Sequence, residues 1–475
     1  MKKQRNIISK LSYACGDIYG GGAFLLIGVL YLNFLTDIVG LEPALAGSIF
    51  FLGKIWDAIS DPLMGVISDN TKSKYGRRRI YFLIGILPIF LSFAMLWFTL
   101  KTDSVVAMYL YYLISYLFLN TTLTLVMIPY NSILPSMTSD YNERTSFITI
   151  RLVFSNIAAL ISAVLPMIVV NMFSNLTTGY AYMGIIFGLF YAIPYLLLFF
   201  GTYENDYNSE KEISKYTISM FLEDYKATFK NKSFRIYSGF YIAGQTAVDF
   251  IVTLFIFYLT YNLNLKELFP VVLGLLLIVQ IISMPIHMKI SKKYGKTTPM
   301  KIGLPIWTIA LVISLFIDSN SSTIYIFLIA ILSGFGCSAS IFVPWSVFPE
   351  LADIDELITG KRREGIYSGL SNLIRKMAQA IALFLIGISL DLIGYIPNVE
   401  QSPQTLLGIK SLFGIAPIFF IVIALYYSSK YKLTEEKYEL IKSHLGKKDK
   451  KNTDLKTKSV CEEVTGIEYS DLKTS

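Results

Sequence analysis

Two carboxylates inside an apolar stretch carry the clearest chemistry of this sequence. Asp57 and Asp61 lie four positions apart in segment 53–62, Gly-Lys-Ile-Trp-Asp-Ala-Ile-Ser-Asp-Pro. On an α-helix this spacing places both on one face, so their oxygens can converge on one small cation. Pro62 has no N–H group, which leaves the carbonyl of Ala58 without its usual helical donor. An acid within a membrane costs about 2.5–3.5 kcal/mol, so we predict a cation site; the alternative is a pair of acids that contacts the basic loop after the helix.

A lysine in a late apolar segment supplies the opposite charge. Lys376 lies about ten residues into the segment 366–392, which is about 15 Å along a helix. A lone lysine at that depth would lose its proton or cost too much, so we expect it to face a wet cavity and a carboxylate. The candidate carboxylates are Asp57, Asp61 and Asp249. The adjacent Arg375 points about 100° away around the helix, so one of the two basic groups is expected to reach the membrane surface.

Other polar side chains in apolar segments are candidates for a substrate cavity. Asp17 precedes Gly20-Gly-Gly22, which permits close backbone approach or unwinding beside a ligand, with helix packing as the alternative. Arg151 lies one or two turns into its segment and either lines a cavity or extends to the interface. Asp249 shares a helix face with the side-chain amide of Gln245, four positions earlier. Trp345 can stack on a sugar ring or belong to an interfacial aromatic belt.

Membrane-spanning helices are the elements that must position these groups. The 475 residues are 54% hydrophobic and 16% charged, whereas soluble domains are about 25% charged. Apolar segments of about 20–25 residues, the length that about 30 Å of hydrocarbon demands, recur about twelve times. We predict spans at 12–36, 44–68, 79–100, 106–130, 148–171, 181–202, 236–261, 269–290, 300–318, 324–348, 366–392 and 405–428.

Basic residues set the orientation of these spans. They concentrate in alternate loops, at residues 2–5, 72–79, 144, 289–296, 361–363 and in the tail. By the positive-inside rule these loops and both termini are cytoplasmic, which requires an even number of spans. Within the first basic loop, Arg77 and Arg78 follow a glycine and are predicted to act as a gate or clamp; the alternative is a topology signal alone.

The chain divides into two similar halves. A hydrophilic segment at 204–235 separates the six spans of 1–203 from the six of 236–428, and a polar tail without a span occupies 429–475. The loop Ser73-Lys-Tyr-Gly76 resembles Lys292-Lys-Tyr-Gly295, about half a molecule later. Such internal similarity is typical of the parallel halves of a major facilitator transporter. The predicted fold is therefore an all-α major facilitator fold.

Several function classes are disfavoured by what the sequence contains. Two histidines make a histidine proton relay improbable, and three separated cysteines have neither metal-ligand nor disulfide-framework spacing. The sequence has no Walker A loop and no HExxH motif, so we do not expect ATP hydrolysis or metalloenzyme chemistry. The net charge of +8 resides in short loops between apolar segments, which argues for topology rather than nucleic-acid binding.

Seven stretches together resemble the glycoside-pentoside-hexuronide:cation symporters. They are Lys10-Leu-Ser-Tyr13, Thr36-Asp-Ile-Val-Gly-Leu41, Trp56-Asp-Ala-Ile-Ser-Asp-Pro62, Ile128-Pro-Tyr130, Leu351-Ala-Asp-Ile-Asp355, Arg362-Arg-Glu-Gly365 and Pro397-Asn-Val-Glu-Gln-Ser402. The resemblance extends from the first predicted span to the twelfth. It implies a major facilitator fold with alternating access, in which Na⁺, Li⁺ or H⁺ moves together with a glycoside or a sugar acid.

The resemblance also implies roles for single residues. The family's cation site corresponds to Asp57 and Asp61 here, and Thr124 matches a nearby threonine of the fourth span. By residue type alone, Thr124 belongs to a run of hydroxyl and amide side chains, and such side chains often form hydrogen bonds to their own helix. Lys376 matches a lysine coupled to the cation site, and Arg151 matches an arginine near the sugar.

On the substrate side the chain departs from the family pattern. Where the family's melibiose carrier has a Lys-Asp pair in the first span, this chain has Gly21 and Gly22, with the acid displaced to Asp17. The carrier's aspartate and tryptophan of the fourth span become Met127 and Asn131. We therefore expect a similar cation site and a different sugar. The predicted substrate-binding residues are Asp17, Arg151, Asn131, Asp249 and Trp345.

The sequence thus predicts a cation-coupled sugar symporter of the cell membrane, not an enzyme, with no cofactor beyond the coupling Na⁺ or H⁺. Its expected partners are a small sugar, a monovalent cation and the lipid bilayer, with no nucleic acid, and the expected oligomeric state is a monomer. Two alternatives stay open. One is the same fold carrying a lysophospholipid or another organic anion, and the other is a non-transporting membrane sensor.

Overall fold

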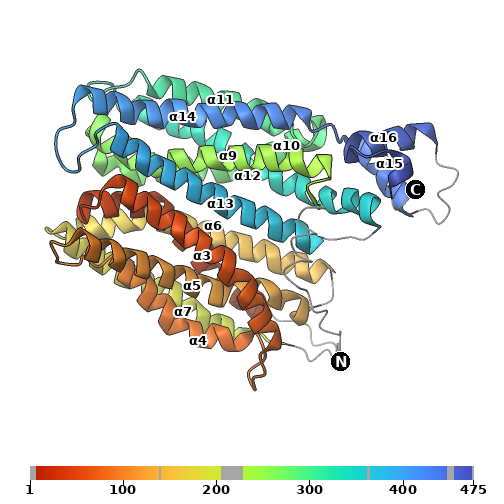
Figure 1. Cartoon of the computed structure of the whole chain (residues 1–475), viewed down its shortest axis with the longest axis horizontal. Helices are drawn as coiled ribbons and strands as arrows, with labels where there is room; N and C mark the ends of the chain where they lie inside the picture. Colours follow the sequence, from red (N-terminus) through yellow and green to blue (C-terminus); the bar gives the residue numbers. More distant parts are fainter. Residues whose placement is uncertain (1–6, 139–140, 205–227, 361–363, 447–453, 473–475) are drawn as a thin grey trace. The chain divides into compact units, whose positions relative to one another are not determined.

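The computed structural model describes residues 7–138, 141–204, 228–360, 364–446 and 454–472, and all regular elements in these ranges are helices (Figure 1). The predicted all-α class is confirmed for this part of the chain. Some basic segments used to predict orientation, at 2–5, 361–363 and 447–451, lie outside the described residues. The same holds for most of the central segment 204–235 and for the side chain of Arg144.

The first half begins with a span built from short helical pieces. These are α1 (Ile7–Cys15), α2 (Asp17–Leu26), and the two π-helical turns η1 (Ile27–Tyr31) and η2 (Phe34–Ile38). Turns of this π type disturb the regular hydrogen-bond ladder and are frequent at functional sites. Five long helices follow: α3 (Pro43–Asn70), α4 (Arg79–Leu96), α5 (Val105–Met137), α6 (Tyr141–Asn171) and α7 (Leu176–Gly201).

The second half repeats this pattern and adds a helical tail. Its spans are α9 (Lys232–Phe257) with η3 (Tyr258–Asn262), α10 (Phe269–Tyr294), α11 (Thr298–Ser314), α12 (Ile324–Thr359), α13 (Glu364–Leu392) and α14 (Pro403–Lys430), with the 3-10 turn η4 (Lys266–Leu268) before α10. The tail forms α15 (Glu435–Gly446), α16 (Leu455–Thr465) and the short turn η5 (Tyr469–Asp471). Each of the predicted spans therefore has a helical counterpart.

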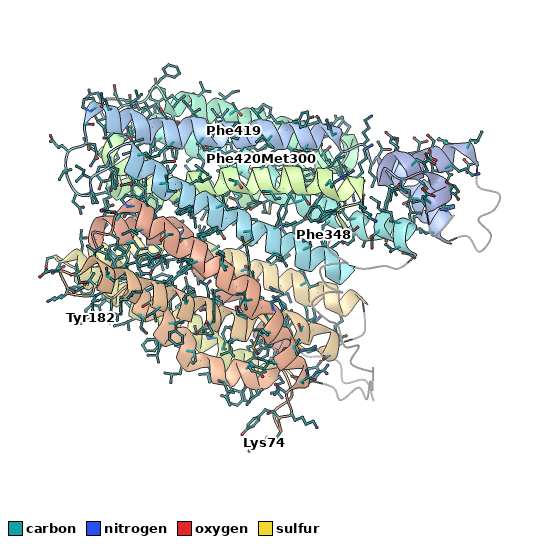
Figure 2. All side chains as sticks on the ribbon, viewed as in Figure 1. Lys74, Tyr182, Met300, Phe348, Phe419 and Phe420 are labelled. Atoms are coloured by element: carbon teal, nitrogen blue, oxygen red, sulfur yellow. The ribbon has the colours of Figure 1, made fainter. Side chains whose placement is uncertain are left out.

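Ten of the described helices are long and apolar enough to cross a membrane. Two predicted spans are not among them, for different reasons. α11 is a shorter apolar helix of 17 residues, whereas α3 contains Lys54, Asp57 and Asp61. Large apolar side chains face outward on the spanning helices, as expected where lipid is the solvent: Tyr182 on α7 is 49% exposed and Phe419 on α14 is 63% exposed (Figure 2).

The two similar basic loops have the same backbone requirement. Gly76 after α3 has φ +100°, and Gly295 after α10 has φ +103°. A positive φ strains residues that carry a Cβ, so both loops need glycine at this position. Lys74 lies in the first of these loops (Figure 2). The internal repeat predicted from sequence thus extends to backbone conformation.

The chain packs as two compact units. The first comprises Met1–Ser209, Val252–Gly274 and Ala380–Ile409, and the second comprises Glu210–Ile251, Leu275–Gln379 and Lys410–Ser475. In the first unit α3 packs on α5, α2 on α6, and α4 on both α5 and α7. In the second, α11 packs on α12, and α15 and α16 pack on each other and on α12.

Candidate functional site

The first predicted aspartate of α3 is buried beside a lysine of the same helix. Asp57 is only 3% exposed, and its carboxylate accepts a hydrogen bond of 3.0 Å from the ammonium of Lys54. Lys54 is equally buried; its ammonium lies 3.4 Å from the amide oxygen of Asn120 on α5 and 5.3 Å from the ring centre of Phe24. Two opposite charges thus neutralise each other inside an apolar helix pair, which greatly reduces the cost of burying either one.

The second predicted aspartate meets the predicted threonine. The hydroxyl of Thr124 on α5 donates to the carboxylate of Asp61 at 2.7 Å, and the hydroxyl of Ser60 lies 3.3 Å from that of Thr124. Close approach of α3 and α5 makes this possible. A Cβ added at Gly53 would lie 2.3 Å from a ring carbon of Tyr116, so a larger residue there would push the helices apart.

Packing of α3 on α5 therefore produces two polar groups one helical turn apart, Asp57 with Lys54 and Asp61 with Thr124 and Ser60. Asp57 and Asp61 supply carboxylates, while Ser60 and Thr124 supply hydroxyls, all of them hard ligands that suit Na⁺ or a proton. Among the described residues no group of three or more His, Cys, Asp or Glu side chains meets as a metal site. Lys54 was not singled out from the sequence, although its charge within the same apolar segment was a signal.

A second cluster joins the first, fourth and fifth spans. The guanidinium of Arg151 on α6 donates to the carboxylate of Asp17 on α2 at 3.0 Å. The same guanidinium lies 4.7 Å from the ring centre of Tyr130 on α5, whose hydroxyl donates to the carbonyl of Tyr13. The structure thus brings together two residues, Asp17 and Arg151, that the sequence could assign only separately.

The glycines after Asp17 serve helix packing. A Cβ at Gly21 would lie 2.2 Å from the hydroxyl of Ser155, and one at Gly22 would lie 2.7 Å from the hydroxyl of Ser162. Both serines belong to α6, so these glycines let α2 approach α6 closely. Of the two interpretations of Gly20–Gly22, packing is the one these contacts support.

In the second unit, Asp249 on α9 pairs with Arg375 on α13. The two nitrogens of the guanidinium each donate to a carboxylate oxygen at 2.8 Å, and the amide of Gln379 lies 3.5 Å from the same carboxylate. This bidentate geometry is the strongest form of such a pair. Asp249, one of the carboxylates that the sequence offered to Lys376, is therefore bound by the neighbouring Arg375.

The remaining predicted residues have no common location. Asn131 on α5 is exposed, and Trp345 on α12 is 64% exposed with its ring 6.4 Å from that of Phe348. Lys376 is partly buried on α13 in the second unit. Asp57 and Asp61 belong to the first unit, so the predicted coupling of Lys376 to them stays a prediction.

The predicted gating arginines hold a loop. The backbone N–H groups of Arg77, Arg78 and Arg79 donate to the carboxylate of Glu204, just after α7, at 3.1, 2.8 and 2.9 Å. The guanidinium of Arg78 donates to the carbonyl of Ser132 on α5 at 2.7 Å. The loop between α3 and α4 is thus fastened to α5 and to the segment just after α7, and the gating role of Arg77 and Arg78 stays a prediction.

One cluster was missed altogether. The carboxylate of Asp37 in η2 accepts hydrogen bonds from the phenols of Tyr261 at 2.6 Å and Tyr395 at 2.5 Å, and its carbonyl accepts one from the amide of Asn398. Burial and the neighbouring Asp37 raise the pKa of Tyr395 far above its usual range, so this phenol stays a donor. Asp37 and Asn398 lie in two stretches that carried the family resemblance, which was the available signal.

Comparison with known proteins identifies relatives along nearly the whole chain. Residues 12–435 match the family described as MFS/sugar transport protein. A Bacillus subtilis protein described as the uncharacterized symporter YjmB is 30% identical over 94% of this chain and 97% of its own length. An Escherichia coli protein described as a putative sulfoquinovose importer is 29% identical over 96% of this chain and 97% of its own.

The fold is also that of solved transporters. A crystal structure of the nucleoside transporter NupG matches with a TM-score of 0.61 at 16% identity, over 91% of this chain and 100% of that chain. Such a likeness establishes the major facilitator architecture and leaves the cargo open.

Proposed function

We propose that this chain, which belongs to the MFS/sugar transport protein family, moves a glycoside, pentoside or hexuronide into the cell together with Na⁺ or H⁺. Family membership makes it a multi-pass membrane transporter rather than an enzyme, and the resemblance to glycoside-pentoside-hexuronide symporters is confirmed. The observation that carries the cation site is the bond of Thr124 to Asp61, one helical turn from buried Asp57.

The coupling mechanism follows from the charges on α3. Lys54 neutralises Asp57 when no cation is bound, while Asp61 accepts a hydrogen bond from the neutral hydroxyl of Thr124. A cation that binds between the two carboxylates must loosen the Lys54 contact, which moves charge on the face of α3. If this favours the sugar-binding arrangement, sugar must tighten cation binding by the same factor.

The energy available from the cation suffices for accumulation. One charge that crosses 100 mV releases about 2.3 kcal/mol, enough for roughly fifty-fold accumulation of a neutral substrate. Lys376 is the proposed link between the cation and the second half of the molecule. Lys376 follows directly after Arg375, which binds Asp249. The two basic residues share one turn of α13, so movement of Lys376 would disturb the Arg375–Asp249 pair, and this supports the link.

The substrate is proposed to be a sugar with hydroxyl or acidic groups. Asp17 with Arg151, and Asp249 with Arg375 and Gln379, offer charged donors and acceptors of the kind that bind sugar hydroxyls. A relative whose printed description is a sulfoquinovose importer supports a sugar acid among the candidates. Asn131 and Trp345 remain proposed substrate contacts.

We propose the cell membrane as the location, with both termini in the cytoplasm, and a monomer as the working unit. The concentration of lysine and arginine in the loops around 72–79 and 289–296 supports this orientation.

The test is transport by the purified protein in vesicles. Counterflow with a panel of glycosides, pentosides and uronides, at varied Na⁺ and pH, should identify the cargo and the coupling ion. Lysophosphatidylcholine in the same panel tests the alternative cargo. Uptake of lysophosphatidylcholine with no response to any sugar would overturn the sugar assignment.

Two variants test the cation site in the same vesicles. Asp61→Asn and Asp57→Cys should abolish uphill accumulation while the protein still inserts, because each removes one carboxylate charge. Asp103→Asn, in an exposed loop, is the control and should transport normally. Cation-dependent uptake that persists unchanged in both site variants would contradict the assignment.

A further inference from the structure

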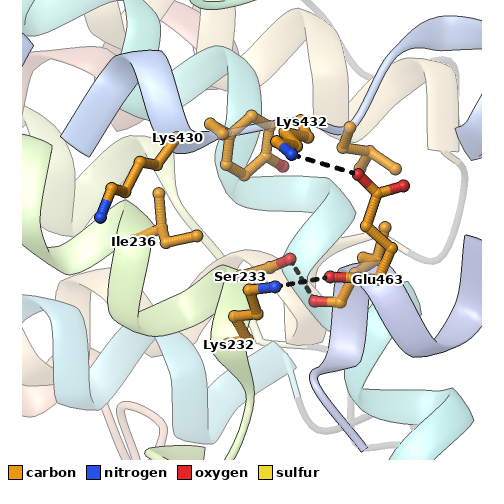
Figure 3. A pocket seen from close by; sticks show the side chains of 9 residues that line it. Lys232, Ser233, Ile236, Lys430, Lys432 and Glu463 are labelled. Carbon is orange, nitrogen blue, oxygen red and sulfur yellow. Dashed lines mark hydrogen bonds and ion pairs between the residues drawn. The ribbon is translucent and has the colours of Figure 1, made fainter. Parts of the chain in front are cut away.

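A hollow lies where the tail meets the ends of two spans. It has a volume of about 280 Å³ and is walled by the start of α9, the end of α14 with the linker 431–433 that follows it, and the C-terminal part of α16 (Figure 3). The residues that line it are Lys232, Ser233, Ile236, Lys430, Tyr431, Lys432, Leu433, Glu463 and Val464. All nine belong to the second unit.

The charges around this hollow are unequal. Three lysines line it, Lys232, Lys430 and Lys432, against one acidic residue, Glu463. The carboxylate of Glu463 lies 3.9 Å from Lys432 and is already bound more closely by Lys437, at 2.6 Å. The lining therefore carries an excess of positive charge.

The lysines are held by neutral groups as well. Lys232 donates to the carbonyl of Glu463 at 3.3 Å, and Lys430 donates to the hydroxyl of Tyr426 and lies 4.2 Å from that ring centre (Figure 3 shows the first contact). These contacts fix two ammonium groups in place without neutralising them. Fixed, uncompensated ammonium groups are suited to bind a phosphate oxygen.

The backbone amides at the start of α9 are not part of this chemistry. The side-chain oxygen of Asn231 accepts from the N–H groups of Ser233 and Phe234, and the hydroxyl of Ser233 donates to the carbonyl of Val464 at 2.7 Å. Recognition of an anion would therefore rest on the lysine side chains. Ile236 and Leu433 add an apolar wall beside them.

The position of the hollow relative to the spans limits its ligand. Lys232 is the first residue of α9 and Lys430 the last of α14, and both helices are candidate membrane spans. The hollow thus lies at the membrane surface, on the side where basic loops predict the cytoplasm. Anionic phospholipid headgroups and soluble phosphates are both found there, and basic pockets at helix ends bind such headgroups.

We propose that this hollow binds a phosphate-bearing anion and that the bound anion fastens the tail to the transporter. Two walls come from spans and one from α16, so an occupant contacts both. A ligand that binds only the docked arrangement stabilises it by mass action. The tail would then sense the lipid or phosphate content of its surroundings.

The chain contains its own reporter of tail docking. Cys461 on α16 is 0% exposed, and burial raises the pKa of its thiol to about 11, so a thiol reagent reaches it only when the tail opens. Its labelling rate can be measured in full-length protein in phosphatidylcholine vesicles. The Cys461→Ser variant keeps Cys15 and Cys337, which are also buried. The difference between its labelling and that of the unmodified protein is therefore the labelling of Cys461.

The experiment compares two sources of phosphate. One arm replaces about a fifth of the phosphatidylcholine with phosphatidylglycerol, and the other adds inorganic phosphate against chloride at equal ionic strength. We expect labelling of Cys461 to slow severalfold in at least one arm, and that arm identifies the source. The combined variant Lys232→Gln, Lys430→Gln, Lys432→Gln should lose this effect.

Two further variants keep the outcome decisive. Lys289→Gln, Lys292→Gln, Lys293→Gln removes the same charge from exposed positions on α10 outside the hollow, and should keep the effect. Ile236→Trp fills the hollow with all lysines present, and should lose it even if the triple lysine variant fails to fold. Labelling that is unchanged in both arms, or an effect that disappears equally in the α10 variant, would overturn the proposal.

Discussion

At the scale of single residues, Lys54 changes how Asp57 works. Its ammonium lies 3.0 Å from the carboxylate, and both groups are almost completely buried. Asp57 therefore already has a cation in the resting protein, one that belongs to the chain. In the proposed mechanism the transported cation competes with Lys54, which would couple cation binding to movement of α3.

Removal of Lys54 should make folding stability depend on the transported cation. In Lys54→Gln the buried carboxylate of Asp57 loses this ion pair, and breaking a buried ion pair typically costs about 3–5 kcal/mol. Added Na⁺ should restore part of this loss if Na⁺ is the coupling ion. Thermal unfolding in Na⁺ and in choline measures the difference.

Lys72→Gln, an exposed position in the loop after α3, is the matched control. In each of the two salts, Lys72→Gln should unfold at the same temperature as the unmodified protein. If Lys54→Gln unfolds like that control, Lys54 does not neutralise Asp57.

A second residue-scale prediction concerns Lys376. Lys376→Ala should impair coupling, so that sugar still crosses the membrane downhill but a cation gradient no longer drives accumulation. Uptake with and without an imposed Na⁺ or H⁺ gradient measures this. Normal stimulation by the cation in this variant would remove Lys376 from the mechanism.

The sequence could predict part of the site because charge is rare in apolar segments. Asp57 and Asp61 were recognisable by their helical spacing, and Thr124 by the resemblance alone, since a threonine is ordinary in a span. The contact between Asp61 and Thr124 depends on how α3 packs against α5, and the local sequence pattern does not determine that packing. The outward position of Trp345 depends on the rotation of α12 in its unit, which is equally absent from residue types.

At the scale of elements, Asp37 ties three segments of the first unit together. It is in η2, while Tyr261 is in η3 and Tyr395 and Asn398 lie in the loop after α13. The orientation predicted from basic loops puts this cluster on the outer side of the membrane. A transporter that alternates its access must break such a tie when it opens outward.

Loss of Asp37 should therefore open the outer side more often. Hydrogen bonds to a charged group contribute about 1.5–3 kcal/mol each, so Asp37→Ala should raise outward opening by roughly tenfold or more. Gly28→Cys can report this, because an added Cβ meets no atom within 4 Å. The measurement is its labelling by a membrane-impermeant maleimide applied from outside.

Two controls accompany this measurement. Glu42→Ala removes an exposed acid near the same end of α3 and should leave labelling unchanged. Gly65→Cys, also free of neighbours within 4 Å but farther along α3, should not respond to Asp37→Ala. Equal labelling of Gly28→Cys with and without Asp37 would show that the cluster does not close the outer side.

The extent of the helices was predictable where apolar residues define it. The predicted span 44–68 corresponds to α3 (Pro43–Asn70), whereas the predicted 324–348 underestimates α12, which continues to Thr359. Pro349 and the acids beyond it are typical of a loop. They remain helical because the acids have partners: the phenol of Tyr438 donates to Asp353, and that of Tyr367 donates to Asp355 at 2.9 Å.

At the scale of the whole molecule, the tail is more than a polar extension. Its composition predicted no span and no independent domain, and both of its helices pack against α12 instead of standing alone. Tyr431 donates to Glu350 at 3.0 Å, and Lys296 contacts the same carboxylate at 2.5 Å. The tail thus shares buried acids with the spans, which a composition-based interpretation cannot detect.

Two ion pairs join α15 to α16, and both should make the packing of these two tail helices sensitive to acid. The hydrogen bond from Lys437 lowers the pKa of Glu463, and the hydrogen bond from Lys456 lowers that of Glu436. A carboxyl with a lowered pKa stabilises the folded form above its ordinary pKa of about 4.3, and this contribution is lost as pH falls through the lowered value. The packing of α15 on α16 should therefore be constant from neutral pH down to about 5 and weaken below about 4.

Cys461 measures this transition too, with a disulfide reagent that reacts with thiols in acid. The labelling rate of the unmodified protein should rise as pH falls below about 4, relative to a small thiol under the same conditions. Glu463→Gln removes one titrating pair. In this variant Cys461 should be labelled faster at neutral pH, and its labelling rate should change less on acidification. Glu439→Gln, an exposed position on α15, should follow the unmodified protein. A rise of equal size in Glu463→Gln would show that other groups, and not this pair, govern the packing of α15 on α16.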